Sequence, residues 1–195
     1  MPAILFLLPA LVAQAPLAPA TLDQLQDLLE AIPEAVVDGK TANLKALLAK
    51  ARTGWDKAKP ELRKTIPEAE ATFIDRQLKA MEKMSPREKA AGAIGISSTL
   101  SRFQPRSPKQ DLQAADRTAM LAWCSVDAGL WQQIPRVAEA FKPVLDQDKG
   151  RPPLAVASAG EALQRFQTAI TKKQAPAAKK ALKELLALGD VLEKP

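Results

Sequence analysis

Apolar side chains recur at helical spacing along most of the chain after residue 20. In the first of these segments, apolar residues stand at positions 22, 25, 28, 29 and 32, so that one face of a helix is apolar. Thr21 and Gln24 have the spacing of a capping box, which predicts a helix start at Thr21. Pro33 predicts either a kink or a last turn, and Asp38-Gly39 is a turn signal that ends the segment.

Seven more segments follow the same pattern, and none of the chain gives a convincing strand pattern. The pattern therefore predicts an all-α fold, an antiparallel helical bundle of about eight short helices. Ser85 is expected to cap the fourth helix. The third helix is expected to turn four side chains inward, those of Phe73, Ile74, Leu78 and Met81. The seven segments cover residues 41–59, 68–83, 86–103, 111–128, 135–143, 155–172 and 176–192.

A proline-rich stretch, residues 105–110, divides the chain after residue 20 almost in half and is expected to be a linker. The two halves, 21–104 and 111–195, have similar punctuation. Sliding one over the other by 89 to 90 residues aligns Gly39 with Gly129 and Pro86 with Pro176. This suggests two similar four-helix halves that arose by duplication. The alternative is that any succession of short helical hairpins acquires such spacing by itself.

The first twenty residues have the pattern of a cleavable export signal. Residues 3–13 are uncharged and apolar, and this run is too short for a bilayer, which needs roughly 20 residues. Ala18-Pro19-Ala20 fits the small-x-small cleavage pattern, so that Thr21 would become the mature N-terminus. The n-region carries no Lys or Arg, which is atypical, and a buried or flexible hydrophobic N-terminus is the alternative. We therefore expect a periplasmic or secreted protein without a transmembrane anchor.

Missing residue types narrow the chemistry. The chain has no histidine, the commonest metal ligand and general base, and its single cysteine, Cys124, excludes an intramolecular disulfide and a thiolate zinc site. No cofactor, metal site or catalytic residue is expected, and haem ligation by histidine is unavailable. Cys124 is expected to be a small buried hydrophobe, the alternative being a bridge between two copies of the chain. These absences favour a protein that works by binding rather than by catalysis.

Charge suggests where a partner would bind. The formal net charge is +6, and lysines gather around the predicted turn between the last two helices. We call this surface the basic tip, a candidate contact for an anionic envelope component or an acidic protein. It lacks the interleaved aromatic residues typical of single-stranded nucleic-acid sites, so nucleic acid is not expected as a partner. An ordinary solvated tip is the alternative. The basic tip consists of Lys172, Lys173, Lys179, Lys180 and Lys183.

Two other features suggest contact surfaces. The first helix carries a stripe of carboxylates at helical spacing, expected to be either a solvated face or a docking face for a basic partner. Gly92 and Gly95 stand inside the fourth predicted helix, where glycine is costly, so that close approach of a neighbouring helix is expected. The stripe consists of Asp23, Asp27, Glu30 and Glu34.

These features favour an exported, non-enzymatic helical protein acting by binding, as a scaffold, adaptor or chaperone-like partner in the cell envelope. The alternative is a carrier of a small apolar ligand in an inter-helix cavity near the two glycines. The sequence leaves the oligomeric state open.

Overall fold

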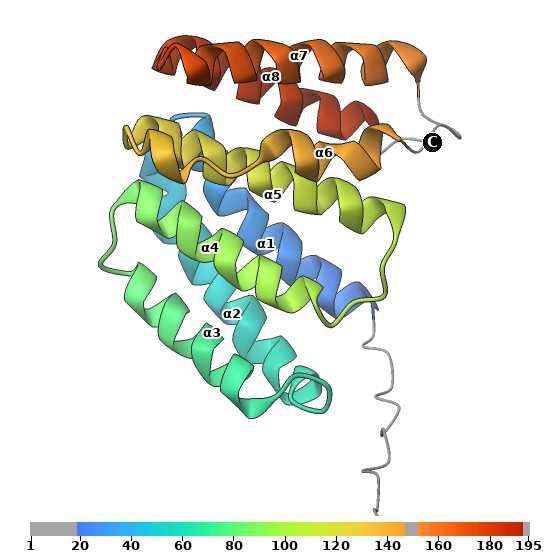
Figure 1. The fold of residues 1–195 in the computed structure, drawn as a ribbon. Helices are drawn as coiled ribbons and strands as arrows, with labels where there is room; N and C mark the ends of the chain where they lie inside the picture. Colours follow the sequence, from blue (N-terminus) through green and yellow to red (C-terminus); the bar gives the residue numbers. More distant parts are fainter. Residues whose placement is uncertain (1–18, 147–151, 193–195) are drawn as a thin grey trace, which may run out of the picture.

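The computed structural model describes residues 19–146 and 152–192, and this part of the chain is helical with no strand (Figure 1). The prediction of an all-α fold is confirmed. The predicted signal segment lies, except for Pro19 and Ala20, outside the described residues. The helices are α1 (Pro19–Val37), α2 (Leu44–Leu62), α3 (Glu68–Met81), α4 (Pro86–Ser101), α5 (Pro108–Asp127), α6 (Val137–Leu145), α7 (Pro153–Thr171) and α8 (Ala175–Leu192), with short 3₁₀ helices η1 (Thr41–Asn43) and η2 (Trp131–Gln133).

Helix boundaries follow the capping signals closely but not everywhere. Ser85 caps α4 as predicted, because its hydroxyl accepts from the Glu88 amide while the Glu88 carboxylate accepts from the Ser85 amide. The start predicted at Thr21 is wrong by two residues, since α1 begins at Pro19. The helix predicted from residue 111 begins at Pro108, where Ser107 is the N-cap. Residues 108–110 of the predicted linker therefore lie in the first turn of α5.

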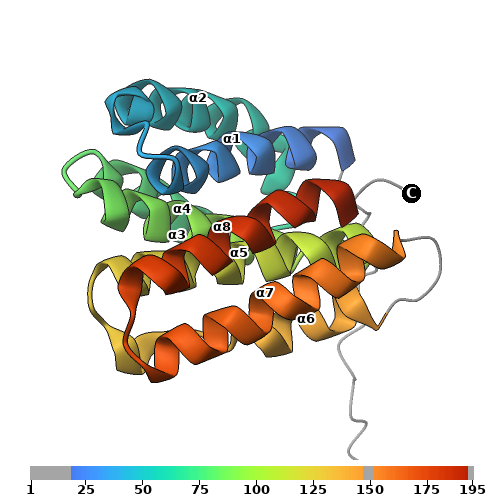
Figure 2. The same cartoon turned by 90° about the horizontal axis from the view of Figure 1, so that it is seen from above.

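The helices pack in two rings of contacts. In the first ring, α1 contacts α2 and α4, and α3 contacts the same two helices. In the second ring, α5 contacts α6 and α8, and α7 contacts the same two helices. The rings meet where α5 packs against α4 and α1. Figures 1 and 2 show the second ring lying alongside the first, with α5 between α4 and α8.

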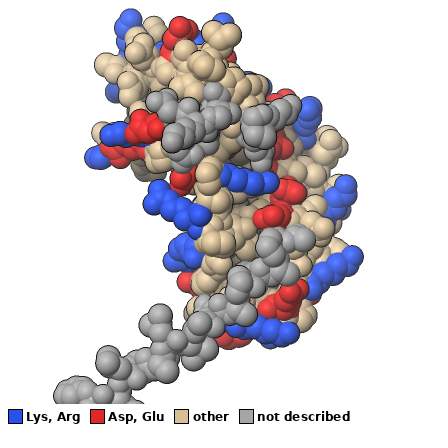
Figure 3. Space-filling model, turned by 90° about the vertical axis from the view of Figure 1, so that its right-hand side faces the viewer, with Lys and Arg blue, Asp and Glu red and all other residues tan. Residues whose placement is uncertain are grey.

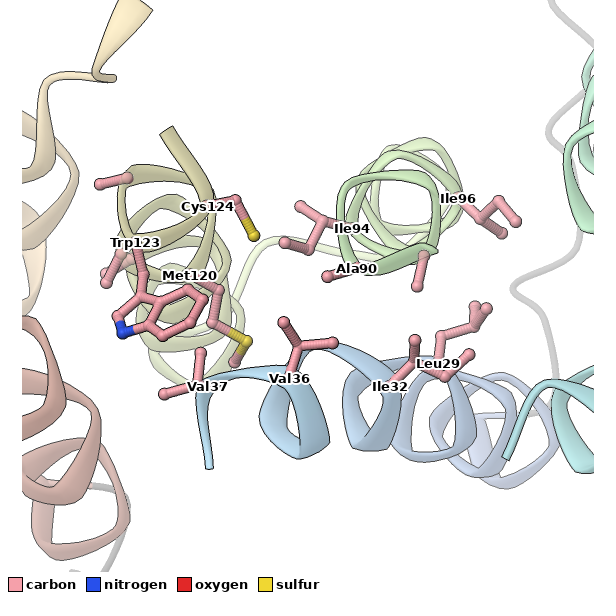
Figure 4. Close-up of a cluster of buried hydrophobic side chains, with 14 of the residues drawn as sticks. Leu29, Ile32, Val36, Val37, Ala90, Ile94, Ile96, Met120, Trp123 and Cys124 are labelled. Carbon is pink, nitrogen blue, oxygen red and sulfur yellow. The ribbon is translucent and has the colours of Figure 1, made fainter. Parts of the chain in front are cut away.

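One continuous core runs through both rings. Figure 4 shows its central part, where Val36 of α1, Ile94 of α4 and Met120 of α5 point toward one another. Three of the four inward side chains expected on α3 are buried, but Phe73 is 41% exposed, so that expectation is wrong. Ala71 occupies the buried position instead, because the contact of α3 with α4 uses the face that carries Ala71, Ile74 and Leu78.

Three helix ends close in the same way. Each has a residue with positive φ just after the helix: Gly39 (76°), Gly129 (69°) and Lys173 (51°). Each also has the paired hydrogen bonds of a Schellman motif, such as Lys40 N to Ala35 O (2.7 Å) and Leu130 N to Ser125 O (2.9 Å). After each of the two glycines a 3₁₀ helix follows, beginning at Thr41 or Trp131.

Candidate functional site

The basic tip lies where α7 ends and α8 begins. Lys172 and Lys173 form the turn between the two helices, and Lys179, Lys180 and Lys183 follow on the first half of α8. The α5–α6 connection lies at the same end of the molecule, beside this turn in Figures 1 and 2. The structure therefore brings the five predicted lysines to one end, together with residues 128–136.

Two of these lysines have acidic partners. The Lys179 ammonium binds the Asp127 carboxylate and lies 4.2 Å from the centre of the Trp123 ring. Lys183 Nζ is 3.9 Å from Asp38 Oδ1, in a pair that is about half exposed and therefore weak. Lys179 consequently holds α8 to the end of α5, and little of its charge is offered to a partner.

The other three lysines are exposed and, among the described residues, pair with no carboxylate: Lys172, Lys173 and Lys180. Lys180 also lines a groove of about 900 Å³ between α7 and α8. The two carboxylates of that groove, Glu161 and Glu184, both bind Arg165. None of the three forms an ion pair with a carboxylate among the described residues, so their charges are exposed to solvent at and near the turn.

The backbone at Lys173 is strained. Lys173 has φ of 51° at the position of a Schellman motif where the other two helix ends carry glycine. A side chain in this left-handed region costs roughly 1 kcal/mol relative to glycine. The turn thus holds an exposed lysine at a position where glycine would be the lower-energy residue.

The carboxylate stripe of α1 divides into internal and external members. Glu30 Oε1 accepts from Arg117 Nη1 of α5 at 3.2 Å, and Asp23 Oδ1 accepts from Gln104 Nε2 at 3.2 Å. Asp27 and Glu34 are the exposed members. A basic partner docking on this stripe stays a prediction, but such a partner would meet two exposed carboxylates rather than four.

Polar side chains continue inward from this stripe. Gln26 is completely buried, donates to Ser101 Oγ (3.2 Å) and accepts from Gln104 Nε2 (3.0 Å). Gln104 in turn accepts from Gln110 Nε2 of α5 at 2.8 Å. These bonds join α1, the end of α4 and α5, so that this polar seam explains part of the stripe structurally.

Burial shifts the pKa values of Glu30 and Arg117, the charged pair that lies between α1 and α5. Desolvation raises the pKa of Glu30 above its ordinary value, although Arg117 opposes this shift. Desolvation likewise lowers the pKa of Arg117, against the opposing influence of Glu30. Arg117 is 4% exposed and also donates to Ser97 Oγ at 3.2 Å, so its charge is fully engaged inside the protein.

The two glycines of α4 have different surroundings. A Cβ at Gly92 would lie 3.0 Å from both Met81 Cγ and Gln77 Nε2 of α3, which confirms the predicted close approach of a neighbouring helix there. A Cβ at Gly95 would meet no atom within 4 Å. The space beside Gly92 is filled by α3, and a ligand cavity at this point, the alternative considered above, gains no support from the packing.

Cys124 is 5% exposed and lies in the core between α4 and α5 (Figure 4). Burial raises the pKa of its thiol to about 11, with Asp127 adding to the shift. A protonated, buried thiol is a poor nucleophile and metal ligand. The expected role as a small hydrophobe is confirmed, and a disulfide between two copies would require this part of the core to open.

The sequence analysis did not predict two features: the apolar residues Leu130 and Trp131 near the basic tip, and the Arg117–Glu30 ion pair. Leu130 is 44% exposed and Trp131 is half-buried, both directly after the turn residue Gly129. The signal for them was an apolar pair outside a helix, where polar residues are usual. The Arg117–Glu30 pair gave no local signal, because its members are 87 residues apart.

Compared with models of protein families, with curated proteins and with solved structures, the chain matches none of them. Within residues 19–146 and 152–192, no helix combines the length and the apolar character needed to cross a membrane.

Proposed function

We propose that this is an exported, non-enzymatic protein that works by binding, and that the basic tip is its contact surface for an anionic partner. One observation carries the proposal: Lys172, Lys173 and Lys180 surround one turn without a carboxylate partner among the described residues. The left-handed backbone of Lys173 supports it, because strain that packing does not explain is often associated with function.

Export follows from the N-terminal pattern, with cleavage after Ala20. The first described core residue is Leu22, so processing at this site removes no side chain that belongs to the described core. Thr21 would then start α1, and its capping-box partner Gln24 remains in place. Sequencing the N-terminus of protein recovered from the cell envelope tests this step, and a protein found uncleaved in the cytoplasm contradicts it.

We also propose that the two rings of helices are antiparallel four-helix bundles related by duplication. The shared closure of α1 and α5 supports this, since Gly39 and Gly129 each take positive φ in a Schellman motif followed by a 3₁₀ helix. In the register of this duplication Lys173 falls on Lys83 and Lys179 on Lys89, whereas Lys180 and Lys183 fall on alanines.

Binding to a soluble polyanion tests the contact surface. Inorganic polyphosphate is titrated against the exported protein at low salt, with the triple variant Lys172→Glu, Lys173→Glu and Lys180→Glu. We expect the affinity to fall by about tenfold or more, because three contacts become repulsive. Binding that is unchanged by this variant contradicts the proposal.

The chain offers a control with the same change of charge. Lys50, Lys57 and Lys64 are exposed, lie on or just after α2, and belong to the side of the molecule away from α7 and α8 (Figure 1). Reversing these three lysines should leave most of the affinity intact. An equal loss in both triple variants would mean that net charge, rather than the tip, governs binding.

A further inference from the structure

We infer that the anionic partner of the basic tip is a lipid bilayer, and that Leu130 and Trp131 enter its headgroup region while the lysines bind lipid phosphates. This inference rests on the proposed function of the tip and names the partner. It is carried by the juxtaposition of an exposed leucine and a half-buried tryptophan with unpaired cations at one end of the molecule.

The apolar pair and the lysines come from neighbouring turns. Leu130 and Trp131 lie in the α5–α6 connection, three and four residues after the end of α5. The Asp127–Lys179 ion pair fixes that end of α5 to the first turns of α8. Both views of the ribbon show the α5–α6 connection beside the α7–α8 turn (Figures 1 and 2). One flat surface can therefore meet both turns at once.

The two parts of this surface match the two layers of a membrane interface. Lysines near an anionic leaflet are attracted to its negative surface potential. Tryptophan is enriched at the headgroup level, where an apolar ring with one polar N–H is well solvated, and leucine favours the acyl boundary below it. Leu130 is 44% exposed, which is costly in water and favourable in that boundary. A hydrated polyanion would use the lysines but would offer no apolar phase to Leu130.

The opposite end of the molecule carries charges of both signs. Figure 3 views the molecule from that side, and Lys or Arg side chains are interspersed there with Asp and Glu. It also exposes apolar residues, since Leu154 is 84% exposed at the start of α7. An exposed leucine is therefore common to both ends, and the inference rests on Leu130 together with the lysines of the neighbouring turn.

Sedimentation with vesicles tests the inference. The exported protein is mixed with vesicles of phosphatidylcholine, with or without phosphatidylglycerol, and the bound fraction is measured. Binding should require phosphatidylglycerol and should weaken by about tenfold in the Leu130→Ser variant. The matched control is Leu154→Ser, an exposed leucine at the opposite end, which should bind as the unchanged protein does. All variants are compared in one background, so that the N-terminal segment is common to them.

Tryptophan fluorescence gives a second readout that does not depend on a variant. Trp55 and Trp123 are 1% and 7% exposed, whereas Trp131 is half-buried. A blue shift of the emission on adding anionic vesicles is therefore expected from Trp131 and should be absent in Trp131→Phe. No shift on addition of polyphosphate is expected, since a hydrated polymer leaves the ring in water.

Each outcome decides the matter. Vesicle binding that is weakened by Leu130→Ser but not by Leu154→Ser, with the blue shift, supports the inference. Binding to polyphosphate without binding to vesicles overturns it and leaves the proposed function standing. Equal effects of the two leucine variants also overturn it, because the apolar pair then has no special part. Binding to neither probe overturns both the inference and the proposed function.

Discussion

Arg117 Nη1 of α5 lies 3.2 Å from Glu30 Oε1 of α1, and the side chains are 5% and 19% exposed. The same guanidinium donates to Ser97 Oγ of α4. One buried cation thus holds together three helices at the place where the two rings of contacts meet. Because a buried charge is costly without its partner, this pair fixes the position of α5 against α1 and α4.

Arg117→Met should lower the free energy of unfolding by about 3 kcal/mol at neutral pH, since it leaves the Glu30 carboxylate buried without its cation. Urea unfolding measures the effect. Arg165→Met is the matched control, because Arg165 also has carboxylate partners but is 54% exposed. Exposed pairs contribute at most about 1 kcal/mol, so similar losses in the two variants would contradict the internal role of Arg117.

The same variant should show a characteristic pH dependence. Burial raises the folded-state pKa of Glu30, and Arg117 opposes that shift. A carboxyl with a raised pKa favours folding below its unfolded pKa, and this contribution is lost as pH rises through the folded pKa. In Arg117→Met the guanidinium that opposes this shift is absent, so the folded-state pKa of Glu30 rises further. The destabilisation should therefore be smaller at about pH 4 than at about pH 7, and a larger loss in acid would contradict this account.

Lys173→Gly should stabilise the protein by about 0.5 to 1 kcal/mol, because glycine adopts the left-handed backbone of this turn without a Cβ penalty. Thermal unfolding shows whether this substitution raises or lowers the stability of the protein. In the opposite direction, Gly39→Ala and Gly129→Ala should each destabilise by about 1 kcal/mol. If Lys173→Gly is no more stable than the unchanged protein, the turn does not have this conformation in solution.

The two glycines of α4 should respond differently to alanine. Gly95→Ala should raise stability by about 0.5 to 1 kcal/mol, because the new methyl group meets no atom within 4 Å and alanine favours helix. Gly92→Ala should be less stable than Gly95→Ala, since its methyl group must displace the buried Met81 side chain. Equal stabilisation by both substitutions would show that α3 does not pack closely on α4.

Cys124 should be unreactive in the folded protein. With a thiol pKa of about 11 and 5% exposure, it has neither thiolate character nor access. A chromogenic disulfide reagent should label Cys124 only when urea unfolds the chain. Labelling and unfolding should therefore occur over the same range of urea concentration. Rapid labelling under native conditions would place the thiol at the surface instead.

Local patterns predicted most of the helices because the apolar spacing and the caps act within one turn or two. Ser85 and Glu88, three residues apart, form the capping box that their spacing predicts. Proline gives a less certain signal, because it can either end a helix or lie inside one. Three prolines lie inside helices, each near a helix end, where packing outweighs the loss of one backbone hydrogen bond: Pro33, Pro60 and Pro143. The helical spacing of Phe73 predicts a core position, but the residue lies at the edge of the apolar face of α3 and is exposed.

The polar seam could not be predicted in the same way. The carboxylate stripe of α1 has the spacing of a solvated face. The α4–α5 connection brings Gln104 to Asp23, and α5 brings Arg117 to Glu30, so two members of the stripe have internal partners. Arg117 lies between the apolar positions Ala115 and Ala119 of α5, and its hydrogen-bonded partner Glu30 is 87 residues away in the sequence. The lysines of the tip were found because charge density is visible locally, whereas their pairing with Asp127 and Asp38 depends on tertiary contacts.

The most direct test of the basic tip measures each lysine separately in the unchanged protein. Exposed amines are acetylated with and without anionic vesicles, and peptide mass spectrometry gives the labelling rate at each position. Because ammonium groups that bind lipid phosphate react more slowly, vesicles should lower the acetylation rate about several-fold at the tip lysines Lys172, Lys173 and Lys180. The rates at the α2 set, Lys50, Lys57 and Lys64, should not change. Equal protection of both sets, or protection of the α2 set alone, would contradict the assignment of the tip as the binding surface.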